Sequence, residues 1–360
     1  MKKVKFGVVG VSTRGRDLMG EIAGKQNFEL CAICDINEQT LGDAVKFFQE
    51  KGISDIECYS NYDDMLKNAG IDAVLVSTDA PSHVPLVIKA LEAGKHVLSE
   101  IPAINTVEEA KQLKCAVKAH PHLKYMVAEN CCYWGFIQAW KTFAEEKRFG
   151  DVVYAESEYL HAKDYRAYNK EQSERNYWRN ALSPIRYLTH NLGPLLYIME
   201  DECVSVSAMM PDVIYNPYSK TPKNGVAIFK TKKGAVIRIL ISFGAFVSLD
   251  HKFRILGTRG TIETDNVKNI KEAHSFARFS DIAGSREKKI EIPIKMSSYG
   301  ENGLHGGADK KMLLDFIDIV LNDKPVVFDV DFAINISLPG IIAEESAKNG
   351  GELMQIPKIN

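Results

Sequence analysis

The stretch Gly7-Val8-Val9-Gly10-Val11-Ser12-Thr13-Arg14-Gly15 decides the fold of this chain. An apolar run that ends in closely spaced glycines predicts a strand, a tight turn and the start of a helix. In a dinucleotide-binding fingerprint, Gly10 makes the turn and Gly15 lets the helix pack close to the strand. Ser12 replaces the middle glycine, so the fingerprint is weakened but kept, since a helix N-terminus still attracts phosphate.

Similar short apolar runs continue along the chain and alternate with helical patterns. The strands expected after Val4–Gly10 are Phe28–Cys34, Ala73–Ser77, His96–Leu98 and Tyr125–Val127, and the helices between them include Gln39–Glu50, His83–Ala93 and Thr106–Ala119. Continuous apolar strands that alternate with helices form a parallel sheet covered on both faces. The sequence therefore predicts an α/β domain over residues 1–125, a Rossmann domain with a doubly wound parallel sheet.

The pattern changes after about Asn130 and predicts an α+β domain over residues 126–360. The expected elements are a helix at Phe136–Arg148, a strand at Val152–Leu160, a helix from Ser183-Pro184, strands between Val204 and Ile294, and helices at Lys310–Leu321 and Phe332–Lys348. Ser as N-cap followed by Pro is a start signal for a helix. Successive strands without intervening helices predict a large, mostly antiparallel sheet.

Composition excludes several classes of protein. The chain has 360 residues with 45 basic and 47 acidic side chains, a near-neutral balance that argues against a nucleic-acid partner. We expect no membrane span, because no apolar run approaches about 18 residues. Seven scattered cysteines form no disulfide framework and favour a cytoplasmic location. No spacing of His, Cys and Asp suggests a metal site.

Asp35 ends the second expected strand, 20 residues after Gly15. A carboxylate at this place binds the ribose hydroxyls of the cofactor and repels a 2′-phosphate, which favours NAD over NADP. An alternative is that Asp35 caps the next helix. Ligands of such sheets bind beside the carboxyl ends of strands, here Ser77–His83 and Ser99–Pro102, where His83 either contacts the cofactor or merely begins a helix.

Several motifs together resemble one enzyme family. They are Ile71–Val76, Ala90–Val97, Glu100-Ile101-Pro102, the turn Gly257–Gly260 and Ala343–Ser346. On these residues the chain resembles the glucose–fructose oxidoreductase/inositol dehydrogenase/MocA family of NAD(P)-dependent oxidoreductases. Two positions depart from that family, because Ile101 replaces its usual Lys and Arg186 replaces the Asp that stands four residues before the catalytic His.

These departures fit one branch. Glu129–Tyr133, Tyr159–His161, Trp178-Arg179 and Tyr187–Pro194 resemble the NAD-dependent α-N-acetylgalactosaminidases of glycoside hydrolase family 109, which also lack the Lys. The resemblance implies a substrate site of Tyr159, Arg179, Tyr187 and His190, with His161 implicated in catalysis. It also implies a cofactor site that includes Thr13, Arg14, Asp35, Ala80, His83, Glu100, Ile101 and Asn130, to which the strand pattern adds Gly10, Ser12, Gly15 and Ser77.

Side-chain periodicity brings the candidate catalytic residues into two pairs. Tyr159 and His161 are two apart on a strand and share a face. Tyr187 and His190 are three apart on the helix, opposite the apolar side formed by Ile185, Leu188, Leu192, Leu195 and Leu196. Pro194 predicts a kink or restart of the helix after His190. The alternative is that His190 is only a surface residue where a new helix begins.

These groups suit proton transfers on a sugar. His190 is the expected base for a ring hydroxyl, because an imidazole can take up and release a proton near neutral pH. Tyr187 or Tyr159 would act on the C2 proton or the leaving group, and His161 would share that role. Trp178 either stacks on a sugar ring or serves as a buried anchor.

We therefore expect an NAD-dependent enzyme that acts on a carbohydrate or glycoside. Redox-neutral glycoside cleavage by oxidation at C3, elimination, addition and reduction is the first hypothesis, and it requires NAD to stay bound through turnover. The alternatives are a net sugar or polyol dehydrogenase and a non-catalytic NAD-binding sensor. The family resemblance also implies a homo-oligomer that packs through the open face of the second sheet.

Overall fold

The computed structural model describes residues 2–161, 182–213, 222–245, 250–264, 274–292 and 303–360. The chain divides into two compact units. The first unit contains Met1–Glu129, Asn302–Ile334 and Ile359–Asn360, and the second contains Asn130–Glu301 and Asn335–Lys358. Among the described residues, no helix combines the length and apolar character that a bilayer crossing requires.

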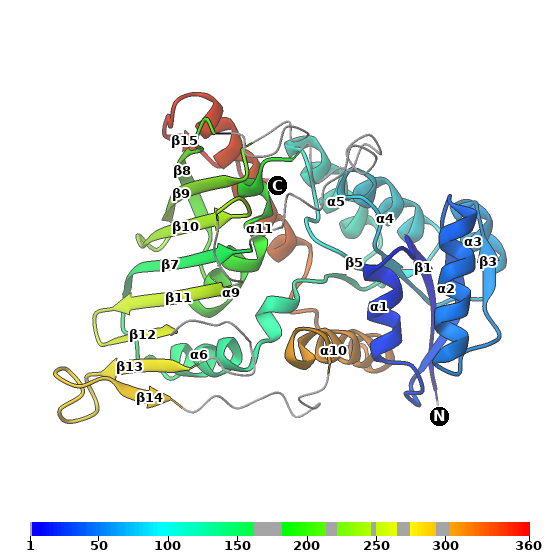
Figure 1. Ribbon diagram of the computed structural model, residues 1–360, viewed down its shortest axis with the longest axis horizontal. Coiled ribbons are helices and arrows are strands. Elements are labelled where there is room, and N and C mark those ends of the chain that lie inside the picture. The colour runs from blue at the N-terminus through cyan, green and yellow to red at the C-terminus, as the bar shows by residue number, and fades with distance from the viewer. Residues whose placement is uncertain (1, 162–181, 214–221, 246–249, 265–273, 293–302) are drawn as a thin grey trace. The chain divides into compact units, whose positions relative to one another are not determined.

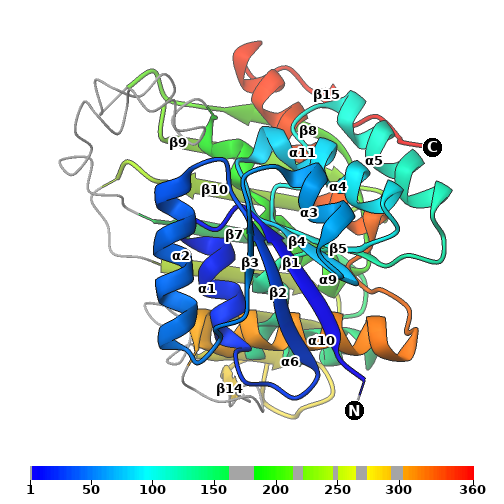
Figure 2. The same ribbon diagram turned by 90° about the vertical axis from the view of Figure 1, so that its right-hand side faces the viewer.

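The first unit is built on a six-stranded sheet in the order β3-β2-β1-β4-β5-β6. Its strands are β1 (Val4–Val9), β2 (Phe28–Cys34), β3 (Glu57–Tyr59), β4 (Ala73–Val76), β5 (His96–Ser99) and β6 (Tyr125–Val127). Its helices are α1 (Arg14–Glu21), α2 (Glu38–Glu50), α3 (Tyr62–Asn68), α4 (His83–Glu92), α5 (Val107–Ala119) and α10 (Ala308–Asn322). Figure 2 shows the parallel strands side by side, with α1 and α2 next to each other.

This strand order confirms the predicted Rossmann fold. Every neighbouring pair in the sheet is parallel, and the order reverses at β1, which pairs with β2 on one side and β4 on the other. Such a reversal opens a crevice for a ligand at the carboxyl ends of the two central strands. The sequence analysis missed β3, a three-residue edge strand whose side chains are mostly exposed and so form no apolar run.

The first unit also takes in a late segment of the chain. α10 packs against α1 and β1, and its Phe316 ring lies 5.9 Å from the ring of Phe6 on β1. Residues 302–334 therefore belong to the first compact unit, although the predicted boundary assigned everything after residue 125 to the second domain. The helix itself was predicted, but the unit on which its apolar face packs depends on a contact distant in sequence.

The second unit carries a nine-stranded sheet in the order β14-β13-β12-β11-β7-β10-β9-β8-β15 (Figure 1). The strands are β7 (Val152–Leu160), β8 (Cys203–Met209), β9 (Asn224–Thr231), β10 (Val236–Ser242), β11 (Asp250–Gly257), β12 (Gly260–Thr264), β13 (Ser275–Phe279), β14 (Ile290–Ile292) and β15 (Met354–Gln355). Among the described strands of this sheet, only β7 and β10 pair in parallel, which confirms the mostly antiparallel sheet.

Helices accompany this sheet in the second unit. They are the short 3-10 turns η2 (Asn130–Tyr133) and η4 (Pro184–Tyr187), and the α-helices α6 (Gly135–Glu145), α9 (Thr189–Met199) and α11 (Val330–Lys348), whose first residues up to Ile334 belong to the first unit. An aromatic core of Trp134, Phe136, Trp140 and Phe253 lies between the α6 segment and β11. The indole N–H of Trp140 donates to Ser275 on β13 at 3.0 Å, so the buried ring has its polar partner.

The helix predicted from Ser183-Pro184 differs from the observed one in its start, its cap and its continuation. Pro184–Tyr187 forms a 3-10 turn, and the α-helix begins at Thr189. The Ser183 hydroxyl contacts the sulfur of Met210 and makes no cap hydrogen bond. Of the kink or restart predicted at Pro194, the restart is wrong, because α9 continues through Pro194 to Met199. The predicted apolar side is confirmed, since Ile185, Leu188, Leu192, Leu195 and Leu196 are all buried.

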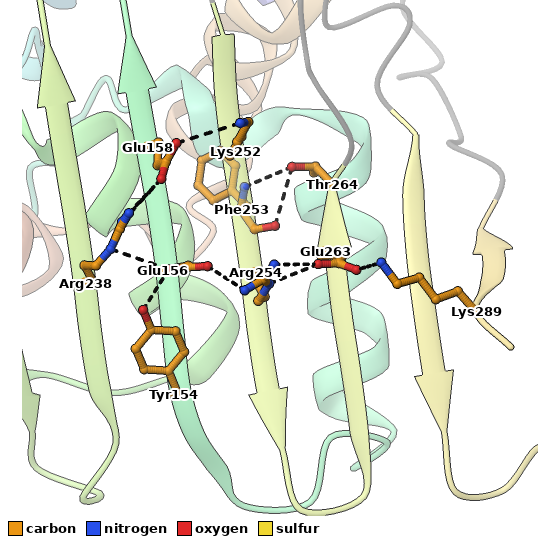
Figure 3. A network of polar contacts seen from close by, with 10 residues as sticks. All are labelled: Tyr154, Glu156, Glu158, Arg238, Lys252, Phe253, Arg254, Glu263, Thr264 and Lys289. Carbon is orange, nitrogen blue, oxygen red and sulfur yellow. Dashed lines mark hydrogen bonds and ion pairs between the residues drawn. The ribbon is translucent and has the colours of Figure 1, made fainter. Parts of the chain in front are cut away.

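The two faces of β7 differ in chemistry, because successive side chains of a strand point to opposite faces. Ala155, Ser157 and Tyr159 are buried, whereas Glu156 and Glu158 lie on the other face. Figure 3 shows that this other face carries a row of alternating charges across β10, β7, β11 and β12. Its members are Arg238 on β10, Glu156 and Glu158 on β7, Lys252 and Arg254 on β11, Glu263 on β12, and Lys289 just before β14.

We predict that the Arg254→Met variant loses about 1 kcal/mol or less of unfolding free energy at low salt. Arg254 bridges Glu156 at 2.9 Å and Glu263 at 3.0 Å, but its side chain is 44% exposed, so water screens both pairs. The difference from the parent protein should shrink in about 1 M salt, where the Debye length falls to about 3 Å. Urea unfolding at both salt concentrations measures it.

Arg278→Met is the matched control, because Arg278 lies on the same face of the sheet, opposite Thr261, and forms no ion pair with any residue in the described ranges. If both variants lose the same unfolding free energy and salt has no effect, the ion pairs of Arg254 do not stabilise the sheet.

Candidate active site

The turn after β1 requires glycine at two positions. Gly10 has a φ of +85°, and a Cβ placed on it would lie 2.5 Å from the backbone oxygen of Ser77 at the end of β4. A Cβ on Gly15 would lie 2.2 Å from the backbone oxygen of Gly10. Side chains at these positions would separate α1 from β1 and β1 from β4. Both glycines therefore have the structural roles that the fingerprint predicts.

Asp35 holds this turn from the end of β2. Its Oδ2 accepts a hydrogen bond from the Val11 backbone N–H at 3.1 Å, and its Oδ1 accepts one from the Asn37 N–H at 3.0 Å. The N-cap of α2 is Asn37 itself, whose side chain accepts from the Thr40 N–H. Asp35 is thus not the helix cap, and its carboxylate lies beside the dinucleotide turn where a ribose would be recognised.

Arg14, the first residue of α1, is held by two carboxylates. Its guanidinium pairs with Glu100 at 2.7 Å and with both oxygens of Asp309 at 2.8 and 2.9 Å. Asp309 on α10 is fully buried and also contacts the His305 ring at 2.7 Å. Burial opposes the charged form of both Arg14 and Asp309. The ion pair outweighs burial, so the pKa of Arg14 lies above its usual value and that of Asp309 well below its usual range.

His83 links the loops that follow β4 and β5. Its Nδ1 lies 3.0 Å from the carbonyl oxygen of Pro102, its Nε2 lies 3.2 Å from that of Thr78, and the side chain is 1% exposed. Burial lowers the pKa of His83 although both carbonyls oppose that shift, so the ring is neutral at neutral pH. Ser77, Ala80, Glu100 and Ile101 lie in the same loops and are buried as well. A direct contact of these side chains with a cofactor stays a prediction.

The second unit gathers the four predicted Tyr and His residues in one cluster. The ring of Tyr159, near the end of β7, lies 5.6 Å from that of His161 and 5.9 Å from that of His190 on α9. The Tyr187 ring lies 5.2 Å from the His190 ring. The ring pairs meet nearly edge to face, at angles of 80° to 83°. Two residue pairs distant in sequence therefore share one site.

Packing of α9 on β7 places these rings together. The amide of Asn191, next to His190, donates a hydrogen bond to the hydroxyl of Ser157, two residues before Tyr159 on the same strand face. Both side chains are fully buried. Tyr187 and His190 are half-buried on the opposite side of the helix segment from its apolar residues, as the periodicity predicts.

Sequence analysis missed three members of this cluster. His251 on β11 is the cross-strand partner of Tyr159, and the two rings stack with centroids 4.4 Å apart at 21°. Phe243 lies 5.5 Å from the Tyr159 ring, and Cys131 of η2 contacts His190. In the sequence, no motif or periodicity around His251 marks it as a site residue. Its role follows from strand register, which no local pattern reveals.

Two predicted substrate residues, Trp178 and Arg179, lie outside the described residues. Asn130, predicted to line the cofactor, begins η2 and is buried.

Comparison with known proteins identifies the family. A model of the oxidoreductase family with an NAD-binding Rossmann fold matches residues 4–129, and a model of the GFO/IDH/MocA C-terminal domain matches residues 137–263. The chain belongs to this family. It therefore carries an NAD-binding domain and is a member of a family of enzymes.

Curated relatives of this family member include glycosidases. A glycosyl hydrolase family 109 protein of Shewanella pealeana is 26% identical over 99% of this chain and 85% of its own length. An alpha-N-acetylgalactosaminidase of Tannerella forsythia is 25% identical over 98% of this chain and 86% of its own length. Among solved structures, a levoglucosan dehydrogenase in complex with NADH and L-sorbose is 18% identical, covers 100% of both chains and has a TM-score of 0.82, a likeness of fold.

The first unit fits NAD on structural grounds. Its glycine turn leaves no room for side chains, α1 begins directly after Ser12 and Thr13, and Asp35 stands at the end of β2. The N–H groups at the start of α1 suit a pyrophosphate, and the carboxylate suits an unmodified ribose.

We predict that Asp309→Asn lowers the unfolding free energy by about 3 kcal/mol at pH 7, because Arg14 loses its fully buried, bidentate partner and keeps only Glu100. The pKa of Asp309 is depressed in the folded chain, so its stabilising contribution is complete above the unfolded pKa of about 4 and is lost as the pH falls below that value. The difference in unfolding free energy between the parent protein and the variant should therefore become smaller in acid. Chemical denaturation from pH 7 down to pH 3 measures it.

Asp318→Asn on the same helix is the control, because Asp318 is about half exposed and pairs with Lys324 at the surface. A loss as large as that of Asp309→Asn, or a gap for Asp309→Asn that stays constant into acid, would contradict the buried pairing.

Proposed function

We propose that this chain is an NAD-dependent glycosidase that cleaves a glycoside without net oxidation. The observation that supports it most strongly is the gathering of Tyr159, His161, Tyr187 and His190 in one cluster. The name of the Tannerella forsythia relative adds an N-acetylgalactosaminide as the first substrate to try.

The first chemical step needs a base for a ring hydroxyl. Bound NAD supplies the acceptance and later return of a hydride at the sugar carbon that carries this hydroxyl, proposed to be C3. His190 takes the hydroxyl proton as the carbonyl forms and gives it back when the hydroxyl is restored. A histidine suits both directions, because imidazole gains and loses a proton near neutral pH.

The second step needs a base and an acid on the neighbouring atoms. A C3 carbonyl makes the C2 proton acidic. One of Tyr159 and Tyr187, as its phenolate, removes this proton, and the hydroxyl of the other gives a proton to the aglycone oxygen as the C1–O bond breaks. Water then adds at C1 and a proton returns to C2. The sum is hydrolysis, and NAD ends as it began. The stacked His251 and the edge of His161 surround the Tyr159 ring and hold its phenol in place.

The position of Ile101 supports this chemistry over ordinary dehydrogenation. Ile101 is buried and apolar where the family resemblance implies a Lys, so the site must use other groups for proton transfer. Arg179 and Trp178 are proposed to bind the sugar. A homo-oligomer formed through the outer face of the second sheet and a cytoplasmic location also remain proposals.

We predict that the protein with NAD releases p-nitrophenol from p-nitrophenyl α-N-acetylgalactosaminide without accumulating NADH. In deuterated water the released sugar should carry deuterium at C2, because the C2 proton exchanges during elimination and addition. Absorbance, NADH fluorescence and mass spectrometry measure the three results. Accumulation of NADH with a free sugar would instead indicate a net dehydrogenase. NAD binding without any turnover of sugars or glycosides would indicate a sensor.

The residue roles are tested with His190→Ala and Tyr187→Phe. Each should lower kcat by about 10²- to 10⁴-fold, the range of a general acid or base, and leave NAD affinity unchanged. His274→Ala and Tyr154→Phe are the matched controls, because His274 is exposed beside Glu291 and Tyr154 lies on the outer face of β7. Full activity in His190→Ala would remove its assigned role.

A further inference from the structure

Cys131 contacts the imidazole of His190. Its Sγ lies 3.2 Å from the Nδ1 of His190, within hydrogen-bonding range for sulfur. Cys131 belongs to η2 and is 2% exposed, whereas His190 is half-buried. Within the second unit, the thiol and the imidazole therefore form a pair brought together from segments 59 residues apart.

The residue one helical turn before His190 does not take this role. Arg186 stands at that place, and its guanidinium lies 3.6 Å from the carboxylate of Glu344 on α11. A cation cannot accept a hydrogen bond from an imidazole N–H. Of these two side chains, only that of Cys131 can do so.

A third residue indicates the direction of the hydrogen bond. The Cys131 S–H has an acceptor in the amide oxygen of Asn130, at 3.5 Å. A thiol has only one proton, so a thiol that donates to Asn130 presents sulfur lone pairs to His190. The proton of the pair then sits on the Nδ1 of His190. A neutral imidazole with its proton on Nδ1 has an unprotonated Nε2, which is the form that a general base requires.

A hydrogen bond in the opposite direction, from Cys131 to His190, would prevent His190 from acting as a base. If Cys131 donated its proton to Nδ1, the neutral ring would carry its own proton on Nε2, where it cannot accept one from a hydroxyl group. The acceptor supplied by Asn130 disfavours this arrangement. The three residues together select one tautomer of His190.

We propose that Cys131 is a positioning residue that fixes the ring orientation and tautomer of His190, a proposal that rests on the proposed function in which His190 is the base. It acts through His190 and does not touch the reacting atoms. In this proposal the thiol supplies the hydrogen-bond acceptor for the Nδ1–H.

The first arm of the test is nuclear magnetic resonance of the full chain labelled with ¹⁵N-histidine, with His190→Gln used to assign the His190 signals. We expect a protonated Nδ1 and an unprotonated Nε2 in the parent protein at a pH where the ring is neutral. Cys131→Ala should change this to a mixture of tautomers or to the Nε2–H form. A protonated Nε2 in the parent protein would overturn the proposal.

The second arm is steady-state turnover of the glycoside. Cys131→Ala should lower kcat by about 10- to 100-fold, part of the 10²- to 10⁴-fold that a general base contributes, with KM changed less than about threefold. Cys131→Ser should restore most of the loss, because a hydroxyl also donates to Asn130 and accepts from Nδ1. An alanine variant as active as the parent, or a serine variant no better than alanine, would overturn the proposal.

Cys203→Ala is the matched control, because Cys203 is also buried but lies on β8. It should leave both the His190 signals and kcat unchanged. The two arms separate this proposal from the proposed function. If no glycoside is turned over by the parent protein, the proposed function fails, while the tautomer in the parent and alanine proteins still decides whether Cys131 positions His190.

Discussion

The candidate site depends on the packing of α9 against β7. The hydrogen bond between Asn191 and Ser157 joins the two elements in a fully buried place, where an unpaired amide or hydroxyl costs about 1–3 kcal/mol. This bond fixes the position of the helix along the strand, and therefore the height of His190 relative to Tyr159. A shift of one residue in β7 would turn Tyr159 to the charged outer face and remove it from the cluster.

Features that arise from residues close together in the chain could be predicted from the sequence. Continuous apolar runs predict buried parallel strands, and the spacing of Gly10 and Gly15 predicts a close helix and a tight turn. Periodicity also predicts that Tyr159 and His161 share a face and that Tyr187 and His190 are neighbours. These features depend on residues close in sequence, so one chain suffices to see them.

Features that depend on distant contacts could not be predicted in this way. His251 joins the site because β11 pairs with β7 in a particular register, and the contact between Cys131 and His190 depends on where η2 lies. α9 continues through Pro194 because its buried apolar side chains, each worth about 1.5–3 kcal/mol, together outweigh a proline cost of about 3 kcal/mol. At Pro194, burial of apolar side chains outweighs the low helix propensity of proline.

The nine-stranded sheet ends in two very short strands. β14 has three residues and β15 has two, whereas the central β7 has nine. A long unpaired strand at a sheet border offers a row of free amide and carbonyl groups to any other extended chain, and so invites fibril-like growth. The tapering of this sheet leaves little such template at either border. A broad open sheet can thus resist edge-to-edge aggregation without closing into a barrel.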